Sequence, residues 1–387
     1  MRPDLFQDGG QKHTSDHDAS QPLIAVMGTT GSGKSSFINH ITSDNAAKVG
    51  DSLEACTRHA HMINFQLDGM QGSIIDTPGF DDTNLSEYQI LEEVSLILQT
   101  LYHGGKKLSG LIYLIDITSA RWKGSDASNL TLFSKICGED SYKNIIFVTT
   151  KWDLIDDEKA VKNEAQFKEK YLSFHIQLGA RLMRHRNTSE TALRVVSSIL
   201  GQSETVLKIQ KELVDGRMGL KDTVAGLHLA TSLQQSVESS SKRLAKFRNE
   251  WRAASSPIVR EALEAAMATE ETKLRNSKID QEKLESANQA TKFFELANTM
   301  DQAAKFTGMS RSDLISILVT KGLAFFLQSA YGMVSKRTDS NTEIELLKQE
   351  LRNVKEGMEA KNGSVYTSWS DVAKILGDVA SAYNRIR

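Results

Sequence analysis

The sequence contains few cysteines, few prolines and no large excess of charge of one sign. Its 387 residues include 2 cysteines and 4 prolines, and the formal net charge is −2. Cys56 and Cys137 are too few for a disulfide framework and lack the spacing of a metal site, which favours a reducing compartment. A net charge close to zero gives no support for binding a polyanion. We therefore expect a cytoplasmic protein that does not bind nucleic acid.

Long apolar runs are also scarce. Residues 1–21 are polar and rich in Asp, Gln, Ser and Gly, which predicts a disordered tail rather than a signal peptide. Residues 314–334 form an apolar run long enough to span a bilayer, but Lys321 and Gln328 interrupt it. A lysine at the centre of a span costs about 2.5 kcal/mol or more. We expect a buried helix there. The alternative is a helix that associates with a membrane or spans it, which would place the protein at a membrane surface.

The order of apolar segments predicts an α/β domain over residues 22–202. Short apolar runs alternate with helix-length amphipathic segments, as in a mostly parallel sheet with helices on both faces. The pair Asp68-Gly69 predicts a hairpin, so one edge of the sheet should be antiparallel. The predicted strands are 23–27, 61–67, 73–75, 111–116, 145–149 and 180–183, and the predicted helices are 35–41, 87–101, 129–137, 157–178 and 189–200.

Residues 203–387 have a different composition. They are rich in Leu, Ala, Lys, Glu, Gln and Ser, and their one proline is Pro257. This pattern predicts an all-α region with a break at that proline. The apolar spacing is patchy rather than a sustained heptad, which favours a helical bundle over a long coiled coil. Residues 344–354 fit one short, zipper-like coiled-coil helix.

The strongest chemical signal is the pattern Gly28-x-x-x-x-Gly33-Lys34-Ser35. It lies between an apolar strand and a helix-forming stretch, which is the context that a P-loop requires. The backbone N–H groups of such a loop surround phosphates, Lys34 would reach the β- and γ-phosphate oxygens, and Ser35 would coordinate Mg²⁺. The predicted nucleotide-contacting residues of this loop are Gly28, Thr29, Thr30, Gly31, Ser32, Gly33, Lys34, Ser35 and Ser36.

Two later motifs favour guanine. Asp76-Thr77-Pro78-Gly79 ends a strand, so Asp76 can hold Mg²⁺ through a water and the Gly79 N–H can sense a γ-phosphate; a plain Pro-Gly turn is the alternative. Lys151-Trp152-Asp153 follows another strand. Asp153 offers two carboxylate oxygens to two donors on one edge of guanine, while Lys151 can pack along the base. Alone this motif fits a solvated loop, but the three together predict GTP/GDP and Mg²⁺ as ligands.

These motifs resemble the translation-factor-class GTPases. The resemblance rests on Gly-Thr-Thr-Gly-Ser-Gly-Lys-Ser-Ser-Phe-Ile-Asn from Gly28, on Asp76–Asp82 and on Thr-Lys-Trp-Asp ending at Asp153. Within that class the chain is most similar to the group of septins, chloroplast import receptor GTPases and avirulence-induced immunity-associated GTPases, close to fungal G domain-containing proteins. The resemblance covers about residues 23–200 and implies a GTP-binding G domain, which the helical region follows.

The resemblance implies further site residues. It places switch I, the loop that closes over the nucleotide, at residues 43–58, with Thr57 closing over Mg²⁺ in the GTP state. An ordinary loop threonine just before a strand is the alternative for Thr57. The resemblance also places Arg184 or His185 beside the guanine, although an exposed basic turn is the alternative. Arg121 matches an arginine that reaches toward the partner's phosphates in the import receptors, and a surface arginine is the alternative.

One departure limits the expected activity. Small GTPases carry a water-orienting glutamine where this chain has Phe80, which makes no hydrogen bond. We therefore expect slow or dimer-assisted GTP hydrolysis by a nucleotide-dependent switch, with Lys34, Thr57, Gly79 and Arg121 in catalysis. The alternative is a non-hydrolysing scaffold that keeps GTP or GDP bound and contacts an unknown protein partner through its helical half. An ATPase or nucleotide kinase is a third possibility.

Overall fold

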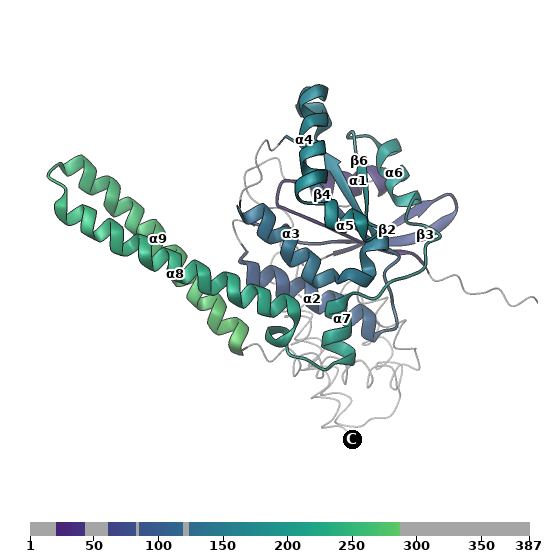
Figure 1. Ribbon diagram of the computed structural model, residues 1–387. Coiled ribbons are helices and arrows are strands. Elements are labelled where there is room, and N and C mark those ends of the chain that lie inside the picture. Colours follow the sequence, from purple (N-terminus) through teal and green to yellow (C-terminus); the bar gives the residue numbers. More distant parts are fainter. Residues whose placement is uncertain (1–20, 43–60, 83–84, 119–123, 287–387) are drawn as a thin grey trace, which may run out of the picture.

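The computed structural model describes residues 21–42, 61–82, 85–118 and 124–286. Its centre is a six-stranded sheet in the order β2-β3-β1-β4-β5-β6 (Figure 1). Neighbouring strands are parallel except β2 and β3, which pair antiparallel through the turn at Asp68 and Gly69, so the predicted antiparallel edge is confirmed. The strands are β1 (Leu23–Gly28), β2 (His61–Leu67), β3 (Met70–Asp76), β4 (Gly110–Asp116), β5 (Ile145–Thr150) and β6 (Arg181–Arg184).

Helices cover both faces of the sheet. Alternate residues of β1 point to opposite faces, so that Ile24 and Val26 pack under α1 and α6, while Ala25 and Met27 join the core beneath α2 and α3. The helices of this part are α1 (Lys34–Thr42), α2 (Glu87–His103), α3 (Gly124–Cys137), α4 (Asp157–Lys170), α5 (Ser173–Gln177) and α6 (Ser189–Ser197). Short 3-10 helices follow α3 (η1, Glu139–Asn144) and β5 (η2, Trp152–Leu154). The fold class predicted from the sequence is thus confirmed.

One predicted helix is divided. The segment 157–178 forms α4 and α5, and the backbone leaves the helix at Tyr171 and Leu172. The buried Leu172 packs in the core beneath the sheet. Neither residue is a helix breaker, so this interruption depends on packing rather than on local sequence.

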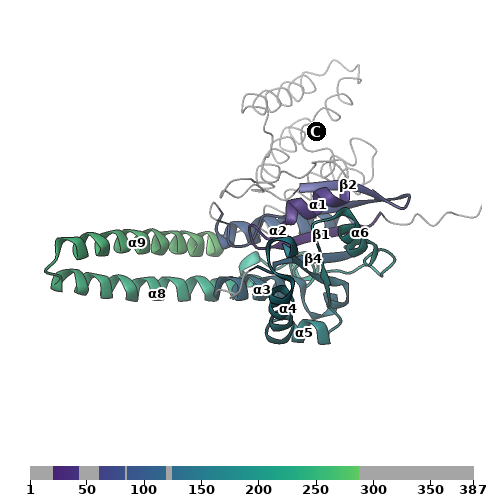
Figure 2. The ribbon, with the colours of Figure 1, turned by 90° about the horizontal axis from the view of Figure 1, so that it is seen from above.

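The helical region begins with short elements and continues as a long hairpin. The short elements are α7 (Lys208–Gln210), the π-helix η3 (Lys211–Asp215) and the 3-10 helix η4 (Leu220–Asp222). Helices α8 (Val224–Ala253) and α9 (Pro257–Ser286) lie side by side and project away from the sheet (Figures 1 and 2). The break falls directly before Pro257, as predicted, and proline is well suited to the first position of a helix.

The first turns of α8 belong to the core of the α/β part. Leu229 and Leu233 lie in the same buried cluster as residues of α2 and α3. A Cβ at Gly226 would lie 1.9 Å from the Leu220 carbonyl oxygen, so this close approach requires glycine. The predicted boundary at residues 202 and 203 stays a prediction.

Several predicted features lie outside the described residues. These are nearly all of the predicted tail, switch I with Thr57, the position of Arg121, and everything after Ser286, including 314–334 and 344–354. Within the described ranges, no helix is both long enough and apolar enough to cross a membrane.

Candidate functional site

The predicted phosphate loop lies between β1 and α1. Its backbone has positive φ angles of 146° at Gly28, 77° at Gly31 and 93° at Gly33, a region that side chains disfavour. A Cβ at Gly28 would also lie 2.7 Å from the Leu114 carbonyl oxygen of the neighbouring strand. The glycine pattern found in the sequence is therefore what this loop conformation requires.

Lys34 opens α1 and points its ammonium group back into the loop. Its Nζ donates hydrogen bonds to the Gly28 carbonyl at 3.2 Å and to the Thr29 carbonyl at 3.0 Å, and the residue is only 7% exposed. Burial lowers the pKa of Lys34 to about 8, against the opposing effect of the Asp76 and Asp82 carboxylates. Negative charge placed at this loop would stabilise the ammonium form.

The hydroxyl groups of the loop also fit a polyphosphate. The Oγ1 of Thr30 and the Oγ of Ser32 are buried, and neither has a hydrogen-bond partner among the described residues. Buried hydroxyls without partners are costly, and phosphate oxygens would accept hydrogen bonds from them. The residue types, the buried lysine and these hydroxyls therefore suit a nucleotide polyphosphate.

The segment that follows β3 lies against the loop. The Phe80 N–H donates to the Gly28 carbonyl at 3.1 Å, and the Thr30 N–H donates to the Phe80 carbonyl at 2.7 Å. A Cβ at Gly79 would lie 2.4 Å from Thr30 Oγ1, so this close contact with the loop requires glycine. Any movement of this segment must therefore change its contacts with the phosphate loop.

Phe80 points away from the loop. Its side chain is 1% exposed and its ring stacks on that of Tyr113 with 6.4 Å between centroids. The residue at the position of the water-orienting glutamine is thus a core residue. Its side chain takes no part in any polar chemistry at the loop.

Ser35 and Asp76 suit a magnesium ion. Ser35 lies in the first turn of α1 and Asp76, 2% exposed, ends β3 beside β1. A hydroxyl and a carboxylate are hard oxygen ligands of the type that Mg²⁺ prefers. The Asp76 carboxylate partly offsets the lowering of the Lys34 pKa by burial. This carboxylate is therefore close enough to the loop to act on charges there.

The predicted base-binding loop is tied to the phosphate loop. The Thr150 hydroxyl at the end of β5 donates to the Ser32 carbonyl at 2.8 Å. Lys151 has a φ of 61°, and its ammonium pairs with Asp116 at 2.6 Å. Asp153 is exposed and accepts a hydrogen bond of 3.2 Å from the Asn187 side chain. The two predicted ligand loops therefore lie at one edge of the sheet.

Sequence reasoning missed Asp116 and Asn187. Asp116 ends β4, and Asn187, with a φ of 57°, follows β6. The carboxyl ends of parallel strands meet at the same edge, so a polar residue after each strand was the available signal. Asp116 and Asn187 position Lys151 and Asp153, respectively.

Arg184 and His185 have partners of their own. The Arg184 guanidinium donates to both carboxylate oxygens of Glu164 and lies 4.5 Å from the centre of the Trp152 ring. His185 is 3% exposed and packs edge-on against Phe37. Burial, with a smaller effect of His40, lowers the pKa of His185 to about 4, so its ring is neutral at pH 7. Their predicted place beside the base stays a prediction.

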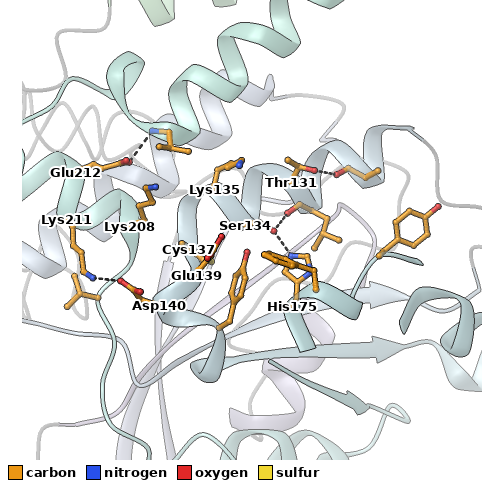
Figure 3. Close-up of a pocket in the computed structure, with 18 of the residues that line it drawn as sticks. Thr131, Ser134, Lys135, Cys137, Glu139, Asp140, His175, Lys208, Lys211 and Glu212 are labelled. Atoms are coloured by element: carbon orange, nitrogen blue, oxygen red, sulfur yellow. Dashed lines mark hydrogen bonds and ion pairs between the residues drawn. The ribbon is translucent and has the colours of Figure 1, made fainter. Parts of the chain in front are cut away.

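A separate pocket lies away from this edge. It has a volume of about 840 Å³ and is lined by residues of α3, η1, α5 and the segment that leads into α8 (Figure 3). Ser134 contacts His175 at 2.7 Å, and Lys211 pairs with Asp140 at 3.1 Å across its wall. None of the predicted nucleotide-contacting residues lines it.

The fold and the phosphate loop together define the α/β part as a P-loop GTPase domain. Residues 23–153 match the family model described as "50S ribosome-binding GTPase". That match covers less than half of the chain.

Curated relatives are similar over part of the chain. GTP-binding protein A of Dictyostelium discoideum is 27% identical over 127 residues, which are 33% of this chain and 27% of that protein. GTPase Der of Agathobacter rectalis is 29% identical over 167 residues, 41% of this chain and 34% of that protein. This chain thus spans about a third or less of the length of these relatives. The structure of Toc33 from Arabidopsis thaliana in complex with GDP and Mg²⁺ is 14% identical, covers 48% of this chain and 87% of that one, and gives a TM-score of 0.40.

Proposed function

We propose that this protein is a guanine-nucleotide-dependent switch that binds GTP and GDP with Mg²⁺ and hydrolyses GTP slowly or with the help of a second copy. The observation that carries the proposal is the hydrogen bond from Thr150 to the Ser32 carbonyl. It joins the loop suited to phosphates to the end of β5, from which the chain leads into the loop whose Asp153 suits guanine. One nucleotide can then contact both loops.

The residues of this chain have distinct tasks in that binding. Lys34 neutralises phosphate charge, and the N–H groups of the loop donate to phosphate oxygens. Asp153, oriented by Asn187, accepts hydrogen bonds from guanine, and Lys151, held by Asp116, packs along the base. Ser35 and Asp76, with Thr57 from switch I, would hold Mg²⁺. When bound, that ion stabilises the negative charge of the phosphates.

Hydrolysis requires a water molecule to be held in line with the γ-phosphate. Phe80 is in the core and has no group for this task. We propose that a second copy compensates for the missing water-orienting group by bringing Arg121 to the phosphates when two GTP-loaded G domains meet. This part of the proposal rests on the resemblance to the import receptor group, as does the placement of the chain in that group.

Calorimetric titration of the full chain with GTP, GDP and ATP in the presence of Mg²⁺ tests the binding. We expect GTP and GDP to bind and ATP to bind far more weakly. Equal binding of ATP would favour an ATPase or nucleotide kinase instead.

A concentration series tests the assisted hydrolysis. Turnover per molecule should rise with protein concentration if two copies cooperate, and Arg121→Ala should abolish that rise. Lys242→Ala, which removes an exposed cation of α8, serves as the control and should keep it. A constant turnover in wild type would contradict the dimer.

The second candidate function is a scaffold that keeps its nucleotide without turning it over. The core position of Phe80 favours it, since the usual water-orienting group is missing. In that case the helical half would be the interaction surface for a protein partner, and residues 314–334 a route to a membrane surface. A scaffold predicts bound GTP that stays intact at every protein concentration.

A further inference from the structure

The root of the α8–α9 hairpin is bonded to the start of α2. Asp280, near the end of α9, is 7% exposed, and its Oδ1 accepts a hydrogen bond of 3.0 Å from Ser86 Oγ. Ser86 is the N-cap of α2, where its hydroxyl accepts from the Gln89 N–H and its own N–H donates to the Gln89 side chain. Asp280 is therefore bonded to the residue that fixes where α2 begins.

The start of α2 comes shortly after the segment that lies on the phosphate loop, and residues 83 and 84 between them are outside the described ranges. Phe80 makes backbone hydrogen bonds with Gly28 and Thr30 of that loop. The next residue, Asp81, has a φ of 62° and accepts a hydrogen bond of 3.4 Å from Ser125 at the start of α3. Burial, followed by the charges of Asp81 and Asp280, raises the pKa of Glu87 in the first turn of α2. Carboxylates of the loop segment, of α2 and of α9 therefore act on one another at this junction.

The hairpin is built as a stiff arm. Side chains connect its helices along their length, with Ser236 on Ser277 at 3.0 Å, and the Trp251 ring N–H donating to Glu264 at 2.9 Å. Each helix has 30 residues and therefore spans about 45 Å. The arm extends away from the sheet (Figure 2). A small rotation at its root would therefore give a larger displacement at its tip.

Both helices are also anchored in the core. Helix α8 contributes Leu229 and Leu233 to the buried cluster, and α9 contributes Leu284 to the same cluster. The hydrogen bond from Ser86 to Asp280 adds a polar link between the start of α2 and α9.

We infer that Asp280 is a positioning residue that makes the direction of the α8–α9 hairpin depend on the bound nucleotide. A movement of Gly79 and Phe80 toward a γ-phosphate displaces the start of α2, and the bond between Ser86 and Asp280 passes that displacement to α9. The inference rests on the proposed nucleotide binding and adds to it the structural output of the switch.

Distance measurements between spin labels test this inference. One label is placed at the hairpin tip with Ser255→Cys and one on β3 with Gln71→Cys, both at exposed positions. Cys56→Ser removes one native thiol, and Cys137 can stay because burial raises the pKa of its thiol and shields it. We expect different label distances with GDP and with a non-hydrolysable GTP analogue, both with Mg²⁺.

Variants of the contact give the decisive comparison. Asp280→Ala and Ser86→Ala should each abolish the difference between the two nucleotides, so the test does not depend on one variant folding. Asp280→Asn should keep it, because the amide oxygen still accepts from Ser86. The matched control is Glu285→Ala, which removes a carboxylate of α9 from an exposed pair with Lys221 and should also keep the difference.

Calorimetry on the same samples measures nucleotide binding separately from the direction of the hairpin. Equal label distances in wild type while both nucleotides are bound would overturn the inference and leave the proposed function standing. A nucleotide-dependent difference that survives in both Asp280→Ala and Ser86→Ala would overturn it as well. If neither nucleotide binds, the proposed function fails, and the inference that rests on it fails too.

Discussion

The proposed nucleotide-binding edge and the α8–α9 hairpin use charge in opposite ways. At the edge, the Lys34 ammonium is buried, and burial lowers its pKa to about 8. Along the hairpin, ion pairs such as Arg248 with Glu271 lie at the surface, where the two side chains are 58% and 51% exposed. A buried charge depends on partners to offset its desolvation, whereas water screens an exposed pair. Equal chemical changes should therefore have very unequal effects in the two regions.

Removing the buried lysine should have the largest effect. Lys34→Ala deletes the buried cation that we propose to contact the phosphates, and the loss of one partner of a buried charge pair costs about 2–5 kcal/mol. GTP affinity should fall about 30-fold or more, measured by titration calorimetry. Lys242→Ala, the exposed lysine of α8, should leave the affinity unchanged. Similar losses for the two lysines would remove the contrast between the regions.

Changing Asp153, the carboxylate that we propose to bind the base, should have the next largest effect. In Asp153→Asn one acceptor oxygen becomes a donor that faces the donors of guanine, and hydrogen bonds to charged groups are worth about 1.5–3 kcal/mol. GTP affinity should fall about 10- to 100-fold while the weak binding of ATP stays the same. The control is Asp157→Asn, which changes an exposed carboxylate at the start of α4 and should leave the GTP affinity unchanged. An undiminished preference for guanine would show that Asp153 does not read the base.

The pH dependence of binding should be of intermediate size. The free protein holds Lys34 with a pKa of about 8, and bound phosphate favours its charged form, so binding takes up a proton above pH 8. Affinity should therefore fall by about tenfold between pH 7 and pH 9. Binding titrations at several pH values, with Lys34→Ala as the control, check this. A flat profile in wild type would contradict a lowered pKa.

The free energy of unfolding of the nucleotide-free protein should rise with pH, whereas the nucleotide affinity falls. Because the folded-state pKa of Lys34 lies below its usual 10.5, the unfolded chain binds more protons between pH 8 and pH 10.5. The cost of burying the ammonium is present in full below pH 8. It is relieved as the pH rises through that window, so this residue's contribution to the free energy of unfolding increases there.

Breaking an ion pair of the hairpin should have the smallest effect. Arg243→Ala removes the partner of Glu270. Burial, the largest single effect, raises the pKa of Glu270, but the hydrogen bonds from Arg243 and Ser240 and the nearby cations together lower this pKa below its usual value. The arginine side chain is 42% exposed, so the free energy of unfolding should drop by less than about 1 kcal/mol. Thermal denaturation measures this, and GTP affinity should not change. If Arg243→Ala lowered the free energy of unfolding by as much as Lys34→Ala lowers the free energy of binding, the hairpin would not be built from weak surface contacts.

The sequence predicted the local parts of this structure well. Short continuous apolar runs placed β1 and its neighbours, because strands of a parallel sheet that is covered on both faces are apolar along their whole length. The phosphate loop was predictable because positive φ angles at Gly28, Gly31 and Gly33 demand glycine. The hairpin break at Pro257 follows from the same kind of local rule.

Contacts between distant segments were not predictable in this way. The bond between Ser86 and Asp280 joins ordinary polar residues from α2 and α9, and no spacing rule connects them. The support of Asp153 by Asn187 depends on how β5 and β6 lie in the sheet. The division of α4 from α5 depends on the burial of Leu172. Such features follow from packing, which becomes visible only once the fold is known.

The central claim is that one guanine nucleotide contacts the phosphate loop and the Asp153 loop together. The most direct test displaces a fluorescent GDP from the full chain with unlabelled GTP, GDP or ATP in the presence of Mg²⁺. The account predicts displacement by GTP and GDP, none by ATP at the same concentrations, and loss of this selectivity in Asp153→Asn. Equal displacement by ATP in wild type would contradict it.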